Sequence, residues 1–167
     1  MRALGELGYP PAPLLRNADR SPAWPPGCHG GITHTQGHCA AAVALASDCA
    51  GVGIDAEVAG RVDETLERRI CTPGEIARLR RMDEAERRLT ATLIFSAKEA
   101  FYKCQSHLAD AIRGFHEVEI ELGEGRFLVL PRKALPLALR ALPSIAGRFR
   151  VDQGLVFAGI LLPGPSR

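Results

Sequence analysis

The sequence predicts an α+β fold in which strands come first, helices follow, and further strands complete the chain. Three observations support this order. Glycine-bounded apolar runs lie between residues 30 and 58, apolar side chains recur every three to four positions from 83 to 107, and alternating apolar and polar residues begin at 115. Segregation of strand-rich and helix-rich stretches is typical of α+β proteins.

The composition is that of an ordinary globular protein. The chain has 167 residues, 46% of them hydrophobic, which is enough to build a core. The net charge of +2 gives no general attraction to nucleic acid or anionic membranes. No signal-like stretch is present at the N-terminus, and the longest apolar runs, 39–46 and 155–162, are too short to span a bilayer. We therefore expect a cytoplasmic protein whose five cysteines are reduced thiols.

The first part of the chain predicts an irregular segment followed by strands. Residues 1–27 are proline-rich, so we expect a lead-in without packed elements. The ordered body is predicted to start near Gly30. The runs "GGITHT" and "HCAAAVALA" predict two strands joined by a turn at Gln36 and Gly37, and "GVGIDAE" predicts a third. We expect these three strands to form a meander.

Three helices are predicted next. The runs "RVDETLERRI" and "TPGEIARLRRM" indicate short helices, and the second has Thr72 as its N-cap and Pro73 at its first position. A longer helix is expected from about 83 to 107. Its apolar positions share one face of a 3.6-residue repeat: Leu89, Leu93, Ala97, Ala100, Phe101 and Cys104.

The last third of the chain predicts strands. The run "FHEVEIEL" alternates between apolar and polar residues, as a half-exposed strand does. The runs "GRFLVLP", "GRFRVD" and "GLVFAGILLP" predict three more strands.

Two carboxylates on the third predicted strand suggest a metal site. Asp55 and Glu57 are two residues apart, so their side chains leave the same face of the strand and repel each other. A divalent cation would offset this repulsion, and Mg²⁺ commonly takes one or two carboxylates together with substrate phosphates. The alternative is that both acids lie on a solvated sheet face.

The long helix carries charges beside its apolar stripe. Glu99 and Lys103 are four residues apart and share a face, whereas Lys98 projects roughly 100° away. An exposed ion pair at this spacing would add only a few tenths of a kcal/mol. Neighbouring apolar residues such as Phe95 and Phe101 argue against a solvated face, and charges in such surroundings need partners.

The stretch "PPGCHGGITHTQGHCAAAV" contains three histidines and two cysteines. Their spacing does not match the paired ligands of structural zinc sites. We expect His34, at the end of a strand beside Thr33, to face a phosphate, and His29 and His38 to lie in turns or on the surface.

Taken together, "GGITHT", "GIDAE" and "FSAKEAFYK" resemble the three motifs of the 4'-phosphopantetheinyl transferases of the Sfp/EntD type. Gly31 stands where the family usually has serine, and Phe95 where it usually has tryptophan. The stretch "RSPAWPPG" also resembles the lead-in of this family. The resemblance extends to about Lys103 and continues more weakly through "GLVFAGILLP".

The resemblance implies an α+β 4'-phosphopantetheinyl transferase-like fold with two pseudo-symmetric lobes, antiparallel sheets and a long helix. Residues 1–29 would be a lead-in and remnant of the first lobe. The transferase domain would span 30–163, with 30–58 completing the first lobe and 59–163 forming the second. Residues 164–167 would be a tail.

The resemblance also implies a reaction. Phosphopantetheine would pass from coenzyme A to a serine of an acyl or peptidyl carrier protein, with Mg²⁺ as cofactor and adenosine 3',5'-bisphosphate as the other product. By motif position, the metal ligands would be Asp55, Glu57 and Glu99. The catalytic groups would be Glu99, as the base that takes the serine proton directly or through a metal-bound water, and Lys103, at the leaving phosphate. The contacts to coenzyme A would come from Arg20, Thr33, His34, Lys98 and Lys103.

Members of this family usually have a longer front segment than this chain. The resemblance therefore implies an incomplete first lobe, weak coenzyme A binding, and self-association through the exposed lobe. One alternative is a non-catalytic member that binds a nucleotide or a carrier protein. Nucleic-acid binding through residues 61–88 is disfavoured, because eight arginines there face seven acids. Some of these arginines are candidates to meet the acidic helix of a carrier protein.

Overall fold

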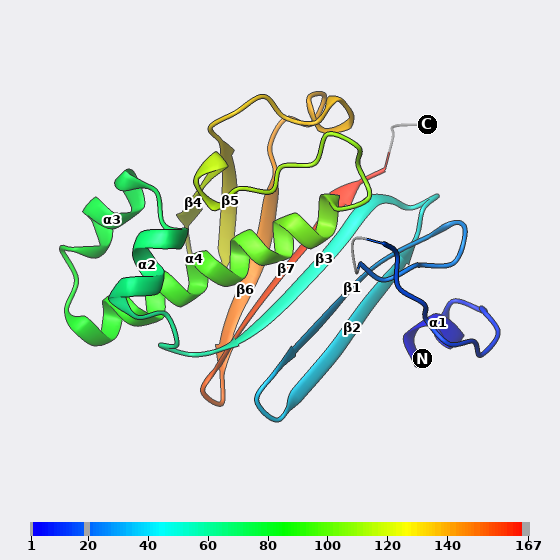
Figure 1. Ribbon diagram of the computed structural model, residues 1–167, viewed down its shortest axis with the longest axis horizontal. Coiled ribbons are helices and arrows are strands. Elements are labelled where there is room, and N and C mark those ends of the chain that lie inside the picture. The colour runs from blue at the N-terminus through cyan, green and yellow to red at the C-terminus, as the bar shows by residue number, and fades with distance from the viewer. Residues whose placement is uncertain (1, 19–20, 165–167) are drawn as a thin grey trace.

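The computed structural model describes residues 2–18 and 21–164. It confirms the predicted α+β fold, since a long helix crosses a five-stranded antiparallel sheet and a two-stranded hairpin runs beside that sheet (Figure 1). The helices are α1 (Arg2–Glu6), α2 (Glu64–Ile70), α3 (Pro73–Leu79) and α4 (Glu84–Gln105), with 3-10 turns η1 (Phe115–Glu117) and η2 (Leu137–Leu139). The strands are β1 (Cys28–Thr35), β2 (His38–Leu45), β3 (Cys49–Val58), β4 (Val118–Leu122), β5 (Arg126–Pro131), β6 (Ala146–Asp152) and β7 (Leu155–Pro163).

The predicted hairpin of β1 and β2 is confirmed. The strands pair antiparallel from Cys28 opposite Leu45 to Thr35 opposite His38. The two-residue turn needs a left-handed backbone, and Gly37 supplies it at φ +72°.

The predicted meander is wrong, because β3 pairs with β7 rather than with β2. The larger sheet has the strand order β3-β7-β6-β5-β4. Most of β3 is buried, so it needs cover on both faces. Helix α4 covers one face, and β1 lies alongside β3 so closely that a Cβ added at Gly31 would be 3.0 Å from the Ile54 nitrogen.

The lead-in is not wholly irregular, since it begins with the short helix α1. Leu4 of this helix is buried, and α1 contacts β2 on the side of the hairpin away from the large sheet (Figure 1). Helix α3 starts as predicted. Thr72 is its N-cap in a capping box with Glu75, and Pro73 is its first residue.

Helix α4 and β3 are in direct backbone contact. A Cβ added at Gly53 would lie 1.9 Å from the Ala100 oxygen, and a Cβ added at Gly51 would lie 2.3 Å from the Cys104 oxygen. Only glycine permits this approach, which explains the "GVG" sequence at the start of the motif. Close packing at this point brings the acidic end of β3 beside the last turns of α4.

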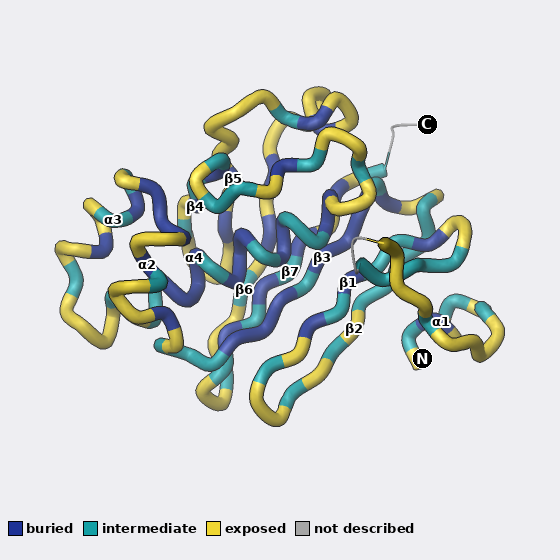
Figure 2. Tube along the Cα trace, viewed as in Figure 1, coloured by how far each residue is buried: buried dark blue, intermediate teal, exposed yellow. Residues whose placement is uncertain are grey.

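The core lies between α4 and the large sheet, where buried positions are concentrated, while the outer turns of α2 and α3 are exposed (Figure 2). Of the predicted apolar stripe of α4, Leu89 is half-buried and the other five residues are buried. Within the described residues, no helix is both long and apolar enough to cross a membrane.

Candidate active site

Asp55 is the centre of a buried polar cluster between β3 and α4. Its Oδ1 accepts a hydrogen bond from Lys103 Nζ at 2.6 Å and another from the Thr33 hydroxyl at 3.2 Å. Its Oδ2 is buried and has no hydrogen-bond partner within the part of the chain that the structure describes. A buried carboxylate oxygen without a partner is unfavourable, so this atom is suited to a ligand that is a cation or a donor.

Thr33 positions Asp55 instead of facing a ligand. It is buried, and its hydroxyl donates to Asp55 while accepting a hydrogen bond from the Ala56 nitrogen at 2.9 Å. Both functions of the hydroxyl are therefore used inside the protein. In this arrangement the hydroxyl proton is not available for the phosphate contact that the motif implied for Thr33.

Glu57 lies on the same strand face as Asp55 and is also buried. Its Oε2 forms an ion pair with the guanidinium of Arg61. The alternative of a solvated pair of acids is wrong, since both carboxylates are over 90% buried.

Glu99 belongs to the same electrostatic cluster. Burial raises the pKa of its carboxyl, Lys103 opposes this shift, and the charges of Asp55 and Glu57 raise the pKa further. The structure thus brings together the three carboxylates and the lysine that the sequence singled out. Among the described residues, no group of three carboxylates, imidazoles or thiols is arranged to enclose a metal ion as it stands. The hard oxygen donors and the unpartnered Asp55 Oδ2 nevertheless fit a Mg²⁺ ion in chemical type.

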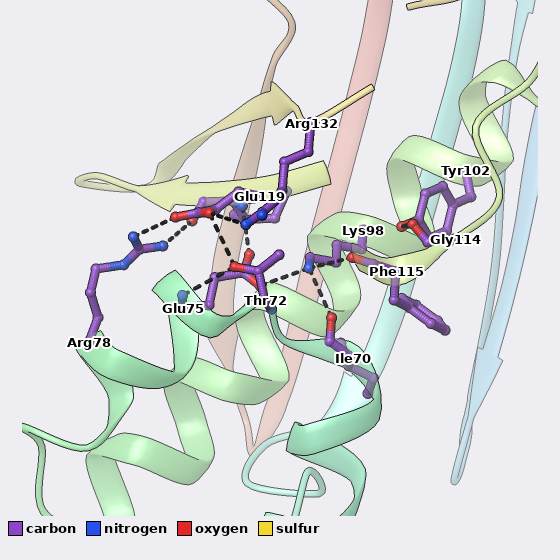
Figure 3. Close-up of polar contacts among 11 residues, drawn as sticks. Ile70, Thr72, Glu75, Arg78, Lys98, Tyr102, Gly114, Phe115, Glu119 and Arg132 are labelled. Atoms are coloured by element: carbon purple, nitrogen blue, oxygen red, sulfur yellow. Dashed lines mark hydrogen bonds and ion pairs between the residues drawn. The ribbon is translucent and has the colours of Figure 1, made fainter. Parts of the chain in front are cut away.

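Lys98 lies in a different, fully buried network (Figure 3). Its Nζ donates to Glu75 Oε2 at 2.8 Å, to the Ile70 oxygen at 2.9 Å and to the Phe115 oxygen at 2.8 Å. These bonds use all three ammonium protons and join α4 to α2, α3 and η1. The structure contradicts the phosphate contact implied for Lys98. The prediction that a charge on this stripe needs partners is confirmed, but the sequence did not identify Glu75 as that partner.

His34 is exposed, as a ligand-binding residue must be, and lines a groove of about 670 Å³. Arg61 and Arg88 line the same groove, so three basic side chains surround it. Neither arginine was predicted as a site residue, because both lie in a charge-balanced stretch and reach the groove only through folding. Arg20, also expected here, lies outside the described residues.

A second, mainly apolar pocket of about 350 Å³ opens beside Lys103. Its lining includes Trp24, Ile32, Tyr102 and Ile112. The Tyr102 hydroxyl donates to the Gly114 oxygen at 2.9 Å and so holds the segment after α4 in place (Figure 3).

Three further histidines contact other rings. The rings of His29 and His107 are tilted against each other with centroids 4.4 Å apart, and His38 contacts the ring of Phe157. All five cysteines are free, which confirms the expected thiols.

Comparisons with known proteins identify the family of the chain. A family model for the 4'-phosphopantetheinyl transferase superfamily matches residues 51–142, and one for the N-terminal domain of these transferases matches 1–44. The chain is 35% identical to the 4'-phosphopantetheinyl transferase Svp of Streptomyces mobaraensis, over 98% of this chain and 68% of Svp. It is 33% identical to the 4'-phosphopantetheinyl transferase PptT of Mycobacterium tuberculosis, over 96% of this chain and 73% of PptT.

Solved structures share the fold. The holo-[acyl-carrier-protein] synthase of Thermotoga maritima matches with a TM-score of 0.57 and 23% identity, over 70% of this chain and 65% of that protein. The holo-ACP-synthase of Plasmodium yoelii matches with a TM-score of 0.54 and 19% identity, over 71% of this chain and 97% of that protein. The chain therefore spans less than two thirds of the Thermotoga protein.

Proposed function

Because the chain belongs to the 4'-phosphopantetheinyl transferase superfamily, we propose that it transfers phosphopantetheine from coenzyme A to a serine of an acyl or peptidyl carrier protein. The observation that carries the proposal is the polar cluster in which Lys103 pairs with Asp55 and the charges of Asp55, Glu57 and Lys103 act on Glu99. Within the described residues, Asp55 Oδ2 has no hydrogen-bond partner. A reducing, cytoplasmic location suits both coenzyme A and the free cysteines.

The basic groove and the apolar pocket are each lined by a cation that pairs with a carboxylate of this cluster. The basic groove contains Arg61, which pairs with Glu57, and the apolar pocket contains Lys103, which pairs with Asp55. The nucleotide end of coenzyme A carries phosphates and suits the basic groove, whereas the uncharged pantetheine arm suits the apolar pocket. A coenzyme A bound in both would have its diphosphate beside the carboxylates.

Asp55, Glu57 and Glu99 would hold Mg²⁺ at the diphosphate. When bound, the ion would neutralise phosphate charge and make the phosphorus easier to attack. Lys103 is placed for the leaving group, since its side chain is 30% exposed and lines the pocket.

The reaction forms a bond between the serine oxygen and the β-phosphorus, and breaks the bond from that phosphorus to the bridging oxygen of the bisphosphate. Glu99 accepts the serine proton. Lys103 stabilises the negative charge that develops on the departing adenosine 3',5'-bisphosphate.

The test is direct transfer. The protein is incubated with coenzyme A, MgCl₂ and a purified apo carrier protein, and the carrier protein is measured by intact-mass spectrometry, with EDTA in a parallel sample. We expect the carrier to gain the mass of one phosphopantetheinyl group only when Mg²⁺ is present. Binding of coenzyme A without transfer to any of several acyl and peptidyl carriers would instead support a non-catalytic binding protein.

A further inference from the structure

Glu57 is a buried carboxylate whose negative charge is paired with a cationic side chain of the same chain. Its exposed fraction is 7%, and Arg61 is the ion-pair partner that the described part of the chain provides. The two residues are four apart and lie at the end of β3 and in the turn that follows. In this state the carboxylate oxygen that faces Arg61 is occupied.

The backbone around Arg61 is fixed. The Arg61 nitrogen donates to the Val58 oxygen at 3.1 Å, and the Ala59 nitrogen donates to the Gly154 oxygen at 2.8 Å. From α4, Arg88 Nε donates to the Gly60 oxygen at 3.0 Å. The turn therefore has little freedom, although it carries a long and flexible side chain.

The Arg61 side chain itself is half-exposed, at 53%, and it lines the groove together with His34 and Arg88. None of the described residues lining this groove is acidic. A planar guanidinium can form paired hydrogen bonds with either a carboxylate or a phosphate. Arg61 can thus reach two alternative partners by side-chain rotation alone, namely Glu57 and an anion in the groove.

The charges of the cluster indicate when each partner is favoured. The three carboxylates exceed the two cations, Lys103 and Arg61, by one negative charge. With a divalent cation present, the excess becomes one positive charge, and Glu57 no longer needs Arg61.

We propose that Arg61 is an exchange residue: it neutralises Glu57 in the absence of a divalent cation, and it binds a phosphate of the nucleotide in the groove when Glu57 becomes a metal ligand. This inference rests on the proposed function. It makes Arg61 a phosphate-binding residue that is free to bind phosphate only when the metal is bound to Glu57.

The test uses two binding measurements on the full chain. Free Mn²⁺ is followed by electron paramagnetic resonance as protein without nucleotide is added, and adenosine 3',5'-bisphosphate is titrated by calorimetry with Mg²⁺ present. For Arg61→Ala we expect Mn²⁺ binding about 3- to 10-fold tighter, because the competing cation is removed. We expect nucleotide binding about 10-fold weaker or more, because a charge-assisted hydrogen bond is lost.

Arg61→Gln provides a second variant of similar length without charge, and the same two changes are expected. The matched control is Arg68→Ala, since Arg68 forms an exposed ion pair with Glu64 and does not line the groove. Neither affinity should change in the control.

Opposite shifts of the two affinities in the Arg61 variants support the exchange. Unchanged affinities, or a loss of both in variants that keep the native circular dichroism spectrum, overturn it and leave the proposed function standing. Wild-type protein that binds neither Mn²⁺ nor the nucleotide contradicts the proposed function and the exchange together.

Discussion

Replacing Lys98 tests whether this lysine stabilises the fold or contacts coenzyme A. In Lys98→Met, three hydrogen bonds from Nζ are lost, and the Ile70 and Phe115 oxygens and the Glu75 carboxylate lose a donor. Methionine has a similar volume, so packing is largely kept. Both members of the ion pair are completely buried, and removing one partner of such a pair costs about 3–5 kcal/mol.

A loss of this size is a large part of the total stability of most domains, which is about 5–15 kcal/mol. For a chain of this length, roughly 2–4 °C of melting temperature corresponds to each kcal/mol, so we expect the melting temperature to fall by at least about 6 °C. The free energy of unfolding is measured from urea titrations followed by circular dichroism.

A double-mutant cycle with Glu75→Gln separates the ion pair from other effects. Glu75 also accepts hydrogen bonds from the Thr72 nitrogen at 2.7 Å and the Ile120 nitrogen at 2.7 Å, and glutamine can keep only part of these. With Lys98 already replaced, Glu75→Gln should cost less than in the wild type, because it then removes an unpaired buried charge.

The exposed pair of Lys133 and Glu117 provides a control, and Lys133→Met should change the unfolding free energy by less than about 1 kcal/mol. The reasoning is refuted if Lys98→Met unfolds like the wild type and binds coenzyme A markedly more weakly. That result would restore the ligand role that the motif implied.

Three further changes test other parts of the structure. Gly53→Ala should destabilise the protein by about 1–3 kcal/mol or more in urea titrations, because its Cβ would lie 1.9 Å from the Ala100 oxygen; an unchanged midpoint would show that β3 and α4 separate easily. His34→Ala should raise KM for coenzyme A and leave kcat nearly unchanged in steady-state assays, since a phosphate contact made equally in ground and transition states affects binding alone. A fall in kcat at constant KM would contradict that role. Burial lowers the pKa of both His29 and His107, so the native state binds fewer protons than the unfolded state, and stability should fall as the pH drops below about 6.5. His107→Gln should reduce this dependence between pH 7 and pH 5, and an identical pH dependence would show that the pair of His29 and His107 is not responsible.

Local structure was predictable from the sequence where local interactions decide it. The hairpin turn at Gly37 follows from the need for positive φ, and the start of α3 follows from the N-cap and capping box of Thr72. The pairing of β3 was not predictable. Its partner β7 lies about a hundred residues further along the chain, and alternation of apolar residues defines a strand without naming its neighbour.

The same limit applies to the site. Asp55 and Glu57 were predictable because the two-residue repeat of a strand puts their side chains on one face. Glu99 and Lys103 were predictable because the 3.6-residue repeat of a helix does the same. Which lysine reaches the cluster depends on tertiary contacts. Lys98 is only one residue from Glu99, yet its partner is on α3.

The most direct test of the central claim is single-turnover transfer by the wild type and by Asp55→Asn, each with Mg²⁺ and with EDTA. Asparagine keeps the side-chain shape and an oxygen for the Thr33 hydroxyl, but it removes the carboxylate charge. Intact mass of the carrier protein and release of adenosine 3',5'-bisphosphate are measured together. We predict transfer by the wild type only with Mg²⁺, and a rate for folded Asp55→Asn that is lower by about a hundredfold or more. Transfer by the wild type in EDTA, or by Asp55→Asn at the wild-type rate, would contradict the carboxylate cluster as the catalytic metal site.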